Sequence, residues 1–142
     1  MKKLNLGCGP DIKKGYVNMD LVNLQGVDVF WDLNKSPWPF KDDTFDEVYC
    51  SHVLEHVDDL IKVMKEIKRV SKHGAVVVIR VPHFSCGVSY RDPTHKSFFL
   101  TLHSIILQIN ASMVICRSLI SKKKNLTSPD FHLLFSTTSL IL

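Results

Sequence analysis

The sequence has few cysteines, and none of them lies close to another. Its 142 residues include four, at positions 8, 50, 86 and 116, without a C-x-x-C pair. Small secreted domains stabilised by disulfide bonds need many cysteines at short spacing. The pattern therefore excludes a disulfide framework and indicates a cytoplasmic protein with reduced thiols.

Long hydrophobic runs are absent as well. Asn5 and Gly7 interrupt the N-terminal segment, so no apolar run of signal-peptide length begins there. The most apolar region, residues 102–120, is broken by polar residues that include His103 and Arg117. A membrane-spanning helix needs about 20 apolar residues in succession, so we expect no membrane partner.

Strong charge of either sign is also missing. The formal net charge is +4, and residues 1–100 carry 14 basic against 13 acidic residues. A nucleic-acid-binding surface needs a basic stripe, so we expect no nucleic acid partner. Hydrophobic content of 45% and charged content of 23% are ordinary for one soluble globular domain of this length.

The apolar residues that are present follow the periods of strands and of a helix. Short strands are predicted at four places: residues 3–6, 16–20, 27–32 and 45–50. An amphipathic helix is predicted over residues 57–70, with Gly74 at its C-terminal cap. The apolar run over 75–81 predicts a strand that is buried on both faces. Strands linked by loops and a helix favour an α/β protein with a parallel sheet.

Glycines, carboxylates and histidines collect where the predicted strands end. These segments are GCGP (7–10), Asp20, Asp32-Leu33, CSHVLEH (50–56) and PHFSCG (82–87). Ligands of parallel α/β sheets bind at the carboxyl ends of the strands. The sequence therefore predicts a ligand site at this edge of the sheet.

The glycine turn after the first strand is open to two interpretations. The dinucleotide fingerprint G-x-G-x-x-G is incomplete, because Ile12 stands where a third glycine is needed. Asp20 follows Gly7 by 13 residues, against roughly 20 in that fingerprint. The turn either brings a different ligand close to the backbone or is a tight structural turn. Asp20 and Asp32 likewise either bind a ligand or form solvated Asx-turns.

Five motifs over residues 3–100, taken in order, resemble the class I S-adenosylmethionine-dependent methyltransferases of the type 11 kind. They are LNLGCGP (4–10), VNMD (17–20), WDLN (31–34), FDEVYCSHVLEHV (45–57) and EIKRVSKHGAVVVIRVP (66–82). The resemblance implies a Rossmann-like, mostly parallel sheet with flanking helices. Only five residues separate Pro10 from Tyr16, so a turn is expected in place of a first helix.

The resemblance also implies a cofactor and the residues that bind it. The cofactor is S-adenosylmethionine, whose methionine part would pass Gly7, Cys8 and Gly9. Asp20 would hold the ribose, Asp32 would accept from the adenine amino group, and Leu33 would pack on the ring. Cys50 and Ser51 would line the methyl-transfer side.

Methyl transfer needs alignment of nucleophile, methyl group and sulfur, and exclusion of water. A general base is needed only when the nucleophile is protonated, as a hydroxyl is. His52 and His83 are the predicted catalytic residues and His95 is a further candidate, because histidine titrates near neutral pH. A structural role stays open for each. The expected acceptor is a small molecule or a glycan-type molecule. The alternative is a cofactor-binding domain that is inactive or is completed by a partner.

His52, Glu55 and His56 form an H-x-x-E-H pattern, which in a helix is typical of zinc peptidases. Here the pattern directly follows a strand, and no glutamate beyond Glu66 could supply a third ligand. In some quinone-biosynthesis O-methyltransferases E-x-x-E-H is thought to hold a divalent cation. Because His52 replaces an oxygen ligand, we predict no metal. Glu55 and His56 are predicted to begin the helix, and His52 stays open as a base, a weak metal ligand or a wall.

Residues 101–142 depart from the resemblance and contain no glycine, tyrosine, tryptophan or glutamate. A helix is predicted within 102–120, and short strands at FHLLF (131–135) and SLIL (139–142). We hypothesise that a truncation or a frameshift changed this part. The predicted cofactor-binding core is thus residues 1–100, and residues 101–142 are an atypical end of the same domain. Residues 82–99 are predicted to form a loop over the site.

Overall fold

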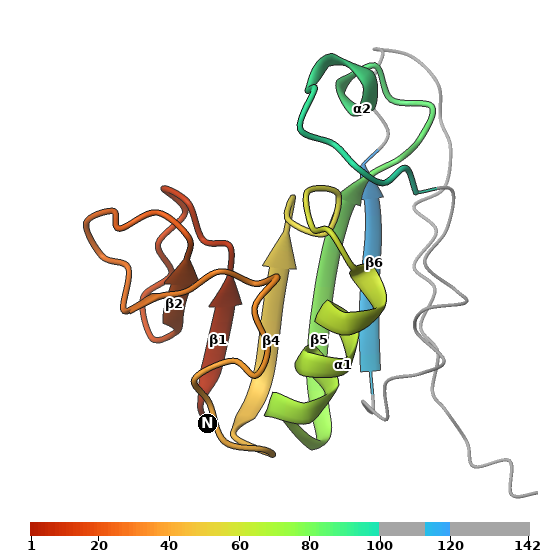
Figure 1. Ribbon diagram of the computed structural model, residues 1–142. Helices are drawn as coiled ribbons and strands as arrows, with labels where there is room; N and C mark the ends of the chain where they lie inside the picture. Colours follow the sequence, from red (N-terminus) through yellow and green to blue (C-terminus); the bar gives the residue numbers. More distant parts are fainter. Residues whose placement is uncertain (100–112, 120–142) are drawn as a thin grey trace, which may run out of the picture.

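Six parallel strands form one sheet in this computed structural model, which describes residues 1–99 and 113–119 (Figure 1). The strands are β1 (Lys3–Leu6), β2 (Val17–Asp20), β3 (Val29–Phe30), β4 (Phe45–Ser51), β5 (Ser71–Pro82) and β6 (Met113–Leu119). Two helices, α1 (Leu60–Val70) and α2 (Val88–Arg91), complete the described elements. The predicted Rossmann-like α/β fold is confirmed.

The order of the strands reverses beside β1. The spatial order is β3-β2-β1-β4-β5-β6, so the chain first moves outward through β2 and β3 and then returns to the other side of β1. Leu6 pairs with Met19 of β2 on one side and with Cys50 of β4 on the other. Such a reversal is a topological switch point, and ligands bind outside the strand ends there.

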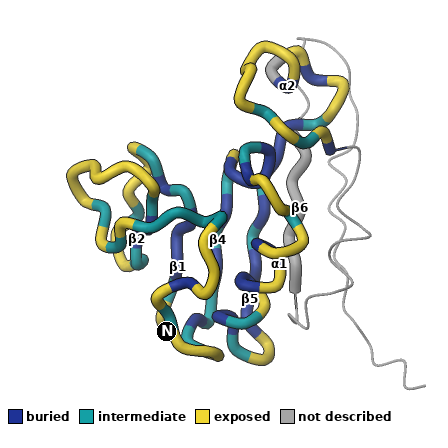
Figure 2. The backbone as a smooth tube through the Cα atoms, viewed as in Figure 1, coloured by how far each residue is buried: buried dark blue, intermediate teal, exposed yellow. Residues whose placement is uncertain are grey.

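A buried apolar core holds the strands and α1 together. The buried residues run along β1, β4 and β5 (Figure 2). Leu4 of β1, Val48 of β4 and Ile79 of β5 have no accessible surface. Ile67 of α1 is equally buried and belongs to the same cluster. This packing fixes the positions of the strand ends, which form the site.

The link between β1 and β2 contains no helix. The amide of Asn5 donates to Asn18 Oδ1 at 3.0 Å and to the carbonyl of Asp11 at 2.9 Å. Asn18 Oδ1 also accepts from the backbone N–H of Lys13 at 2.9 Å. These two buried amides satisfy backbone groups of residues 7–16 that a helix would otherwise pair. The turn predicted at this place is confirmed.

Helix α1 begins later than predicted. Asp59 is its N-cap, with Oδ1 accepting from the backbone N–H of Lys62 at 3.0 Å. Glu55 and His56 lie before it in a turn, in which the His56 N–H donates to the Val53 carbonyl at 3.0 Å. The prediction that Glu55 and His56 begin the helix is therefore wrong, because the Asp59 carboxylate defines the first turn.

The helix ends at Val70, as predicted, but its C-terminal cap is a different residue. Ser71 is its C-cap, and both its N–H and its hydroxyl donate to the Ile67 carbonyl. Gly74, with a φ of 83°, lies within β5, so the predicted glycine cap is wrong. Lys68 and Arg69 occupy the last turn, where cations stabilise the negative end of a helix.

Strands β3 and β6 differ from the sequence predictions. β3 covers only Val29–Phe30 of the predicted 27–32. β6 lies parallel to β5, with Ile115 opposite Val78, so the helix predicted over 102–120 is wrong for residues 113–119. The rest of that helix and the FHLLF and SLIL strands fall outside the described residues. Among the described helices, none is long and apolar enough to cross a membrane.

Candidate functional site

The loop after β1 packs directly on the turn after β4, at the switch point of the sheet. Gly7 has a φ of 56°, in the left-handed region that favours glycine. A Cβ added to Gly7 would lie 2.4 Å from Cγ2 of Val53. A side chain at position 7 is thus excluded, and the loop after β1 lies in direct contact with the turn after β4.

Gly9 and Asp20 fix the shape of the glycine loop. The Gly9 N–H donates to Asp20 Oδ2 at 2.7 Å, and Asp20 Oδ1 accepts from the Val22 N–H at 2.8 Å. Gly9 has a φ of 48°, and an added Cβ there would meet no atom within 4 Å. The backbone of Gly9 therefore borders open space, and its position is fixed by the hydrogen bond to Asp20.

Cys8 lies between the two glycines and is buried. Its N–H donates to the carbonyl of Met19 at 3.1 Å, which continues the pairing of β1 with β2. Burial, together with the nearby Asp20 carboxylate, raises the pKa of the Cys8 thiol. The thiol is therefore neutral and is poorly suited to act as a nucleophile.

Asp32 and Leu33 follow β3, beside Asp20. Asp32 Oδ1 accepts from the N–H of Asn34 at 3.0 Å, which is an Asx-turn contact. Leu33 is half-buried and packs against the core, and its carbonyl accepts from Trp38 Nε1 at 3.2 Å. Each carboxylate has about four lone-pair positions, so Asp20 and Asp32 both keep capacity to accept from a ligand.

The last two residues of β4 and the residue that follows them have different environments. Cys50 has no accessible surface, and burial raises the pKa of its thiol far above the ordinary value. Ser51 is half-buried and pairs with Arg80 of β5. The His52 N–H donates to the Arg80 carbonyl at 2.9 Å, and its side chain is 47% exposed. His52 also has a φ of 56°, which turns the chain sharply at the strand end. Cys50 thus faces the core, and His52 faces outward.

The other predicted histidines follow β5. His83 comes directly after the strand, with Nδ1 2.7 Å from the hydroxyl of Ser85. His95 lies beyond α2, with Nδ1 2.9 Å from the carbonyl of Ser89. Since β4 and β5 are neighbours, His52 and His83 occupy adjacent strand ends. Residues 83–99 and α2 lie beyond the carboxyl end of β5 (Figure 1).

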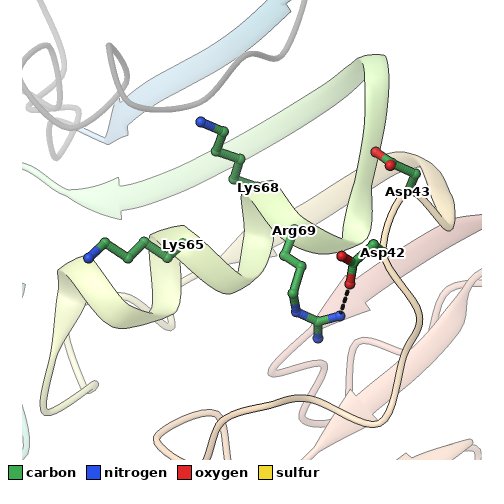
Figure 3. Close-up of a pocket in the computed structure, with 5 residues that line it drawn as sticks. All are labelled: Asp42, Asp43, Lys65, Lys68 and Arg69. Carbon is green, nitrogen blue, oxygen red and sulfur yellow. Dashed lines mark hydrogen bonds and ion pairs between the residues drawn. The ribbon is translucent and has the colours of Figure 1, made fainter.

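A charged hollow lies at the opposite edge of the sheet (Figure 3). Its lining residues are Asp42, Asp43, Lys65, Lys68 and Arg69. Asp42 and Asp43 precede β4, and Arg69 lies in the last turn of α1. Nη1 of Arg69 is 2.7 Å from Oδ1 of Asp42. This hollow stands at the amino ends of the strands, so it is separate from the predicted site.

The sequence reasoning missed Val53 at the site edge and did not predict the burial of Glu55. Val53 closes against Gly7, and Glu55 is completely buried beside His52. Both follow from contacts between segments that are distant in the sequence, which local spacing does not reveal. An apolar residue two positions after the strand is the one available signal for Val53.

Comparisons with known proteins agree with this geometry. A family model described as a methyltransferase domain matches residues 8–79. The sterol 4-C-methyltransferase of Caenorhabditis elegans is 36% identical over 67 residues, which are 47% of this chain and 19% of that protein. An uncharacterized protein of Methanocaldococcus jannaschii is 52% identical over 44 residues, 30% of this chain and 19% of that protein. The match thus spans about a fifth of the length of these relatives.

A solved structure shows the same fold. It is the complex between the Haloferax volcanii Trm112 methyltransferase activator and a methyltransferase. The TM-score is 0.59 at 14% identity, over 89% of this chain and 68% of the solved chain. The family match covers residues 8–10 of the glycine loop, both strand-end carboxylates and the turn after β4. The chain belongs to the methyltransferase domain family.

Proposed function

We propose that the chain is an S-adenosylmethionine-dependent methyltransferase that acts on a small-molecule or glycan-type acceptor. The single observation that carries the proposal is the Gly9 loop at the switch point. Its backbone borders open space and is held by Asp20 through a hydrogen bond of 2.7 Å. A nucleoside-bearing ligand needs such a close backbone approach beside a carboxylate that can accept from its ribose.

The donor and acceptor groups of this edge fit the cofactor. Gly9 leaves room for the methionine part, and Asp20 keeps lone pairs for the ribose hydroxyls. Asp32 and Leu33 follow the next strand, where the adenine would lie. When bound, the cofactor supplies an activated methyl group. Cys50 is completely buried in the core and does not touch the ligand in this proposal.

The exposed histidines serve the acceptor. His52 and His83 end adjacent strands, and each has a ring that is not fully buried. Either imidazole can take the proton that a hydroxyl acceptor loses on methylation. Residues 83–99, which lie beyond β5, restrict access of water to that side. The protein's role is then alignment, desolvation and proton removal.

Isothermal titration with S-adenosylmethionine tests the cofactor assignment. We expect the chain to bind, and Asp20→Ala to bind at least about tenfold more weakly because ribose contacts are lost. Asp11→Ala is the matched control, since the Asp11 carboxylate is exposed and pairs only with Lys13 among the described residues. Absence of heat in the unaltered chain, or equal binding by Asp20→Ala, contradicts the proposal. Methyl transfer to an acceptor library then identifies the substrate class.

A partner-completed domain is the second candidate. The edge strand β3 exposes Phe30, and Leu21 and Val22 after β2 are also more than half exposed. The solved methyltransferase of similar fold was obtained in a complex with an activator. Exposed apolar residues at a sheet edge are suited to pairing with another protein. This candidate predicts cofactor binding without methyl transfer by the isolated chain.

A further inference from the structure

We propose that Glu55, His56 and His95 bind one divalent cation of the zinc class. One ligand atom from each of the three lies within 4.8 Å of the others. Glu55 and His56 belong to the turn after β4, and His95 belongs to the segment after α2. A cation at this place would join two loops that are 39 residues apart in the sequence. The inference does not depend on the proposed methyltransferase activity.

The buried Glu55 carboxylate has no hydrogen-bond donor among the described residues, and His52 can form an ion pair with it only when its imidazole is protonated. The residue has no accessible surface, and neither side-chain oxygen has a hydrogen-bond donor among the described residues. Nδ1 of His52 is 3.3 Å from Oε1, without the geometry of a hydrogen bond. Burying a carboxylate without compensation is energetically unfavourable. A cation between Glu55 and the two histidines would supply that compensation.

The hydrogen bonds of both imidazoles leave a nitrogen free to bind a cation. The Ser89 carbonyl can only accept, so the His95 Nδ1 that lies 2.9 Å away carries the proton. The Thr94 hydroxyl donates its one proton to Asp92 at 2.6 Å and must therefore accept from His56 Nδ1 at 2.9 Å. Both rings then carry the lone pair on Nε2. Metal-binding histidines are typically oriented by such a bond from the other nitrogen.

The donor set selects the kind of cation. Two imidazoles and one carboxylate suit Zn²⁺ and its neighbours, whereas Mg²⁺ prefers oxygen ligands. Ligand atoms on one tetrahedral zinc ion are about 3.3 Å apart. The distances between the three ligand atoms must therefore shorten by roughly 1.5 Å at most. Asp92 Oδ2 lies 3.9 Å from His95 Nε2 and is near enough to join them. His52 is outside this set, so the site is not the complete H-x-x-E-H pattern, and the proposal departs from the sequence prediction of no metal.

The backbone already holds the two loops together. The carbonyl of Glu55 accepts from the N–H of Lys96 at 2.7 Å and from the N–H of Ser97 at 3.3 Å. The rings of His56 and His95 meet edge to face, with centroids 4.8 Å apart. The two loops are therefore already held beside each other, and rotation of the side chains can bring the three ligand atoms to one cation.

Titration of the chelator-treated full chain with Zn²⁺ alone tests the site. We expect one ion per chain, and binding weakened more than tenfold by Glu55→Gln, His56→Asn and His95→Asn. His73→Asn is the matched control, because His73 is an exposed histidine at the start of β5. Circular dichroism of each variant checks that it is folded.

A second measurement uses the unaltered chain and needs no variant. Diethyl pyrocarbonate modifies histidine nitrogens that are free, and mass spectrometry locates the product. We expect Zn²⁺ to protect His56 and His95 and to leave His73 reactive. Equal modification of His56 and His95 with and without Zn²⁺, or Zn²⁺ binding that only His73→Asn removes, would overturn the proposal.

Discussion

The two glycines after β1 are required for different physical reasons. Both have positive φ, so any other L residue is strained at either position. Position 7 has the further problem that its Cβ would meet both methyl groups of Val53, a β-branched side chain with little rotational freedom. Position 9 borders open space. Gly7 is therefore required for packing against Val53, and Gly9 leaves space beside the backbone for a ligand.

Alanine substitution separates these two roles. We predict that Gly7→Ala lowers the free energy of unfolding by about 1–3 kcal/mol more than Gly9→Ala, because only Gly7→Ala also overpacks against Val53. Urea unfolding of both variants measures the difference. A Gly9→Ala variant as unstable as Gly7→Ala would show that the space beside Gly9 is closed.

Glu66 supports the loop before β4 through buried contacts. Its carboxylate accepts from Arg69 at 2.7 and 2.8 Å and from the N–H of Trp38 at 2.7 Å. The hydrogen bond with Arg69, and to a smaller extent the one with Trp38, lowers the pKa of Glu66. A lowered pKa stabilises the fold above the ordinary value of about 4.3, and this stability is lost as the pH falls below it.

Glu66→Gln should therefore flatten part of the acid dependence of stability. We predict that the unaltered chain loses stability between about pH 5 and 3, and that the variant is less stable near pH 7 but loses less on acidification. Thermal unfolding at several pH values measures this. Asp43→Asn is the control, since the Asp43 side chain is exposed. Parallel pH curves for Glu66→Gln and the unaltered chain would contradict the assignment.

At the scale of elements, α1 depends on its cap more than on its apolar pattern. The apolar period begins at Val57, yet the helix begins at Leu60 because Asp59 accepts from the backbone of Lys62. We predict that Asp59→Ala costs about 1 kcal/mol of stability and that Asp59→Asn, which keeps the acceptor oxygen, costs much less. Urea unfolding compares them. An equal loss of stability in both variants would show that the negative charge of Asp59, and not its capping hydrogen bond, stabilises the helix.

The elements show which parts of the fold a sequence can predict. β1, β2 and β4 were predicted within a residue or so, because apolar strands ending in glycine or aspartate are local signals. The length of β3 and the turn at 53–56 were not, because pairing to β2 and the Asp59 cap decide them. β6 was predicted as a helix, since its pairing to β5 is a long-range contact. The positions of Gly7, Gly9 and Asp20 at the ends of β1 and β2 were predicted, but the burial of Cys50 and the position of Val53 depend on packing.

At the scale of the whole molecule, one reversal of strand order explains where the site lies. The ends of β2, β1 and β4 meet beside that reversal and bring the glycine loop, Asp20 and His52 to one edge. The charged hollow near Arg69 lies at the other edge (Figure 3). The central claim is that the cofactor binds at the first edge and not at the second.

Nuclear magnetic resonance of the ¹⁵N-labelled chain, titrated with S-adenosylhomocysteine, tests this claim most directly. This demethylated product of the cofactor has no methyl group to transfer, so the measurement reports binding alone. We predict shifted amide signals for Gly7, Gly9 and Asp20, and for Leu33 and Ser51 at the neighbouring strand ends. Lys65 and Lys68 should not shift. Unchanged spectra, or shifts confined to Lys65, Lys68 and Arg69, would contradict the account.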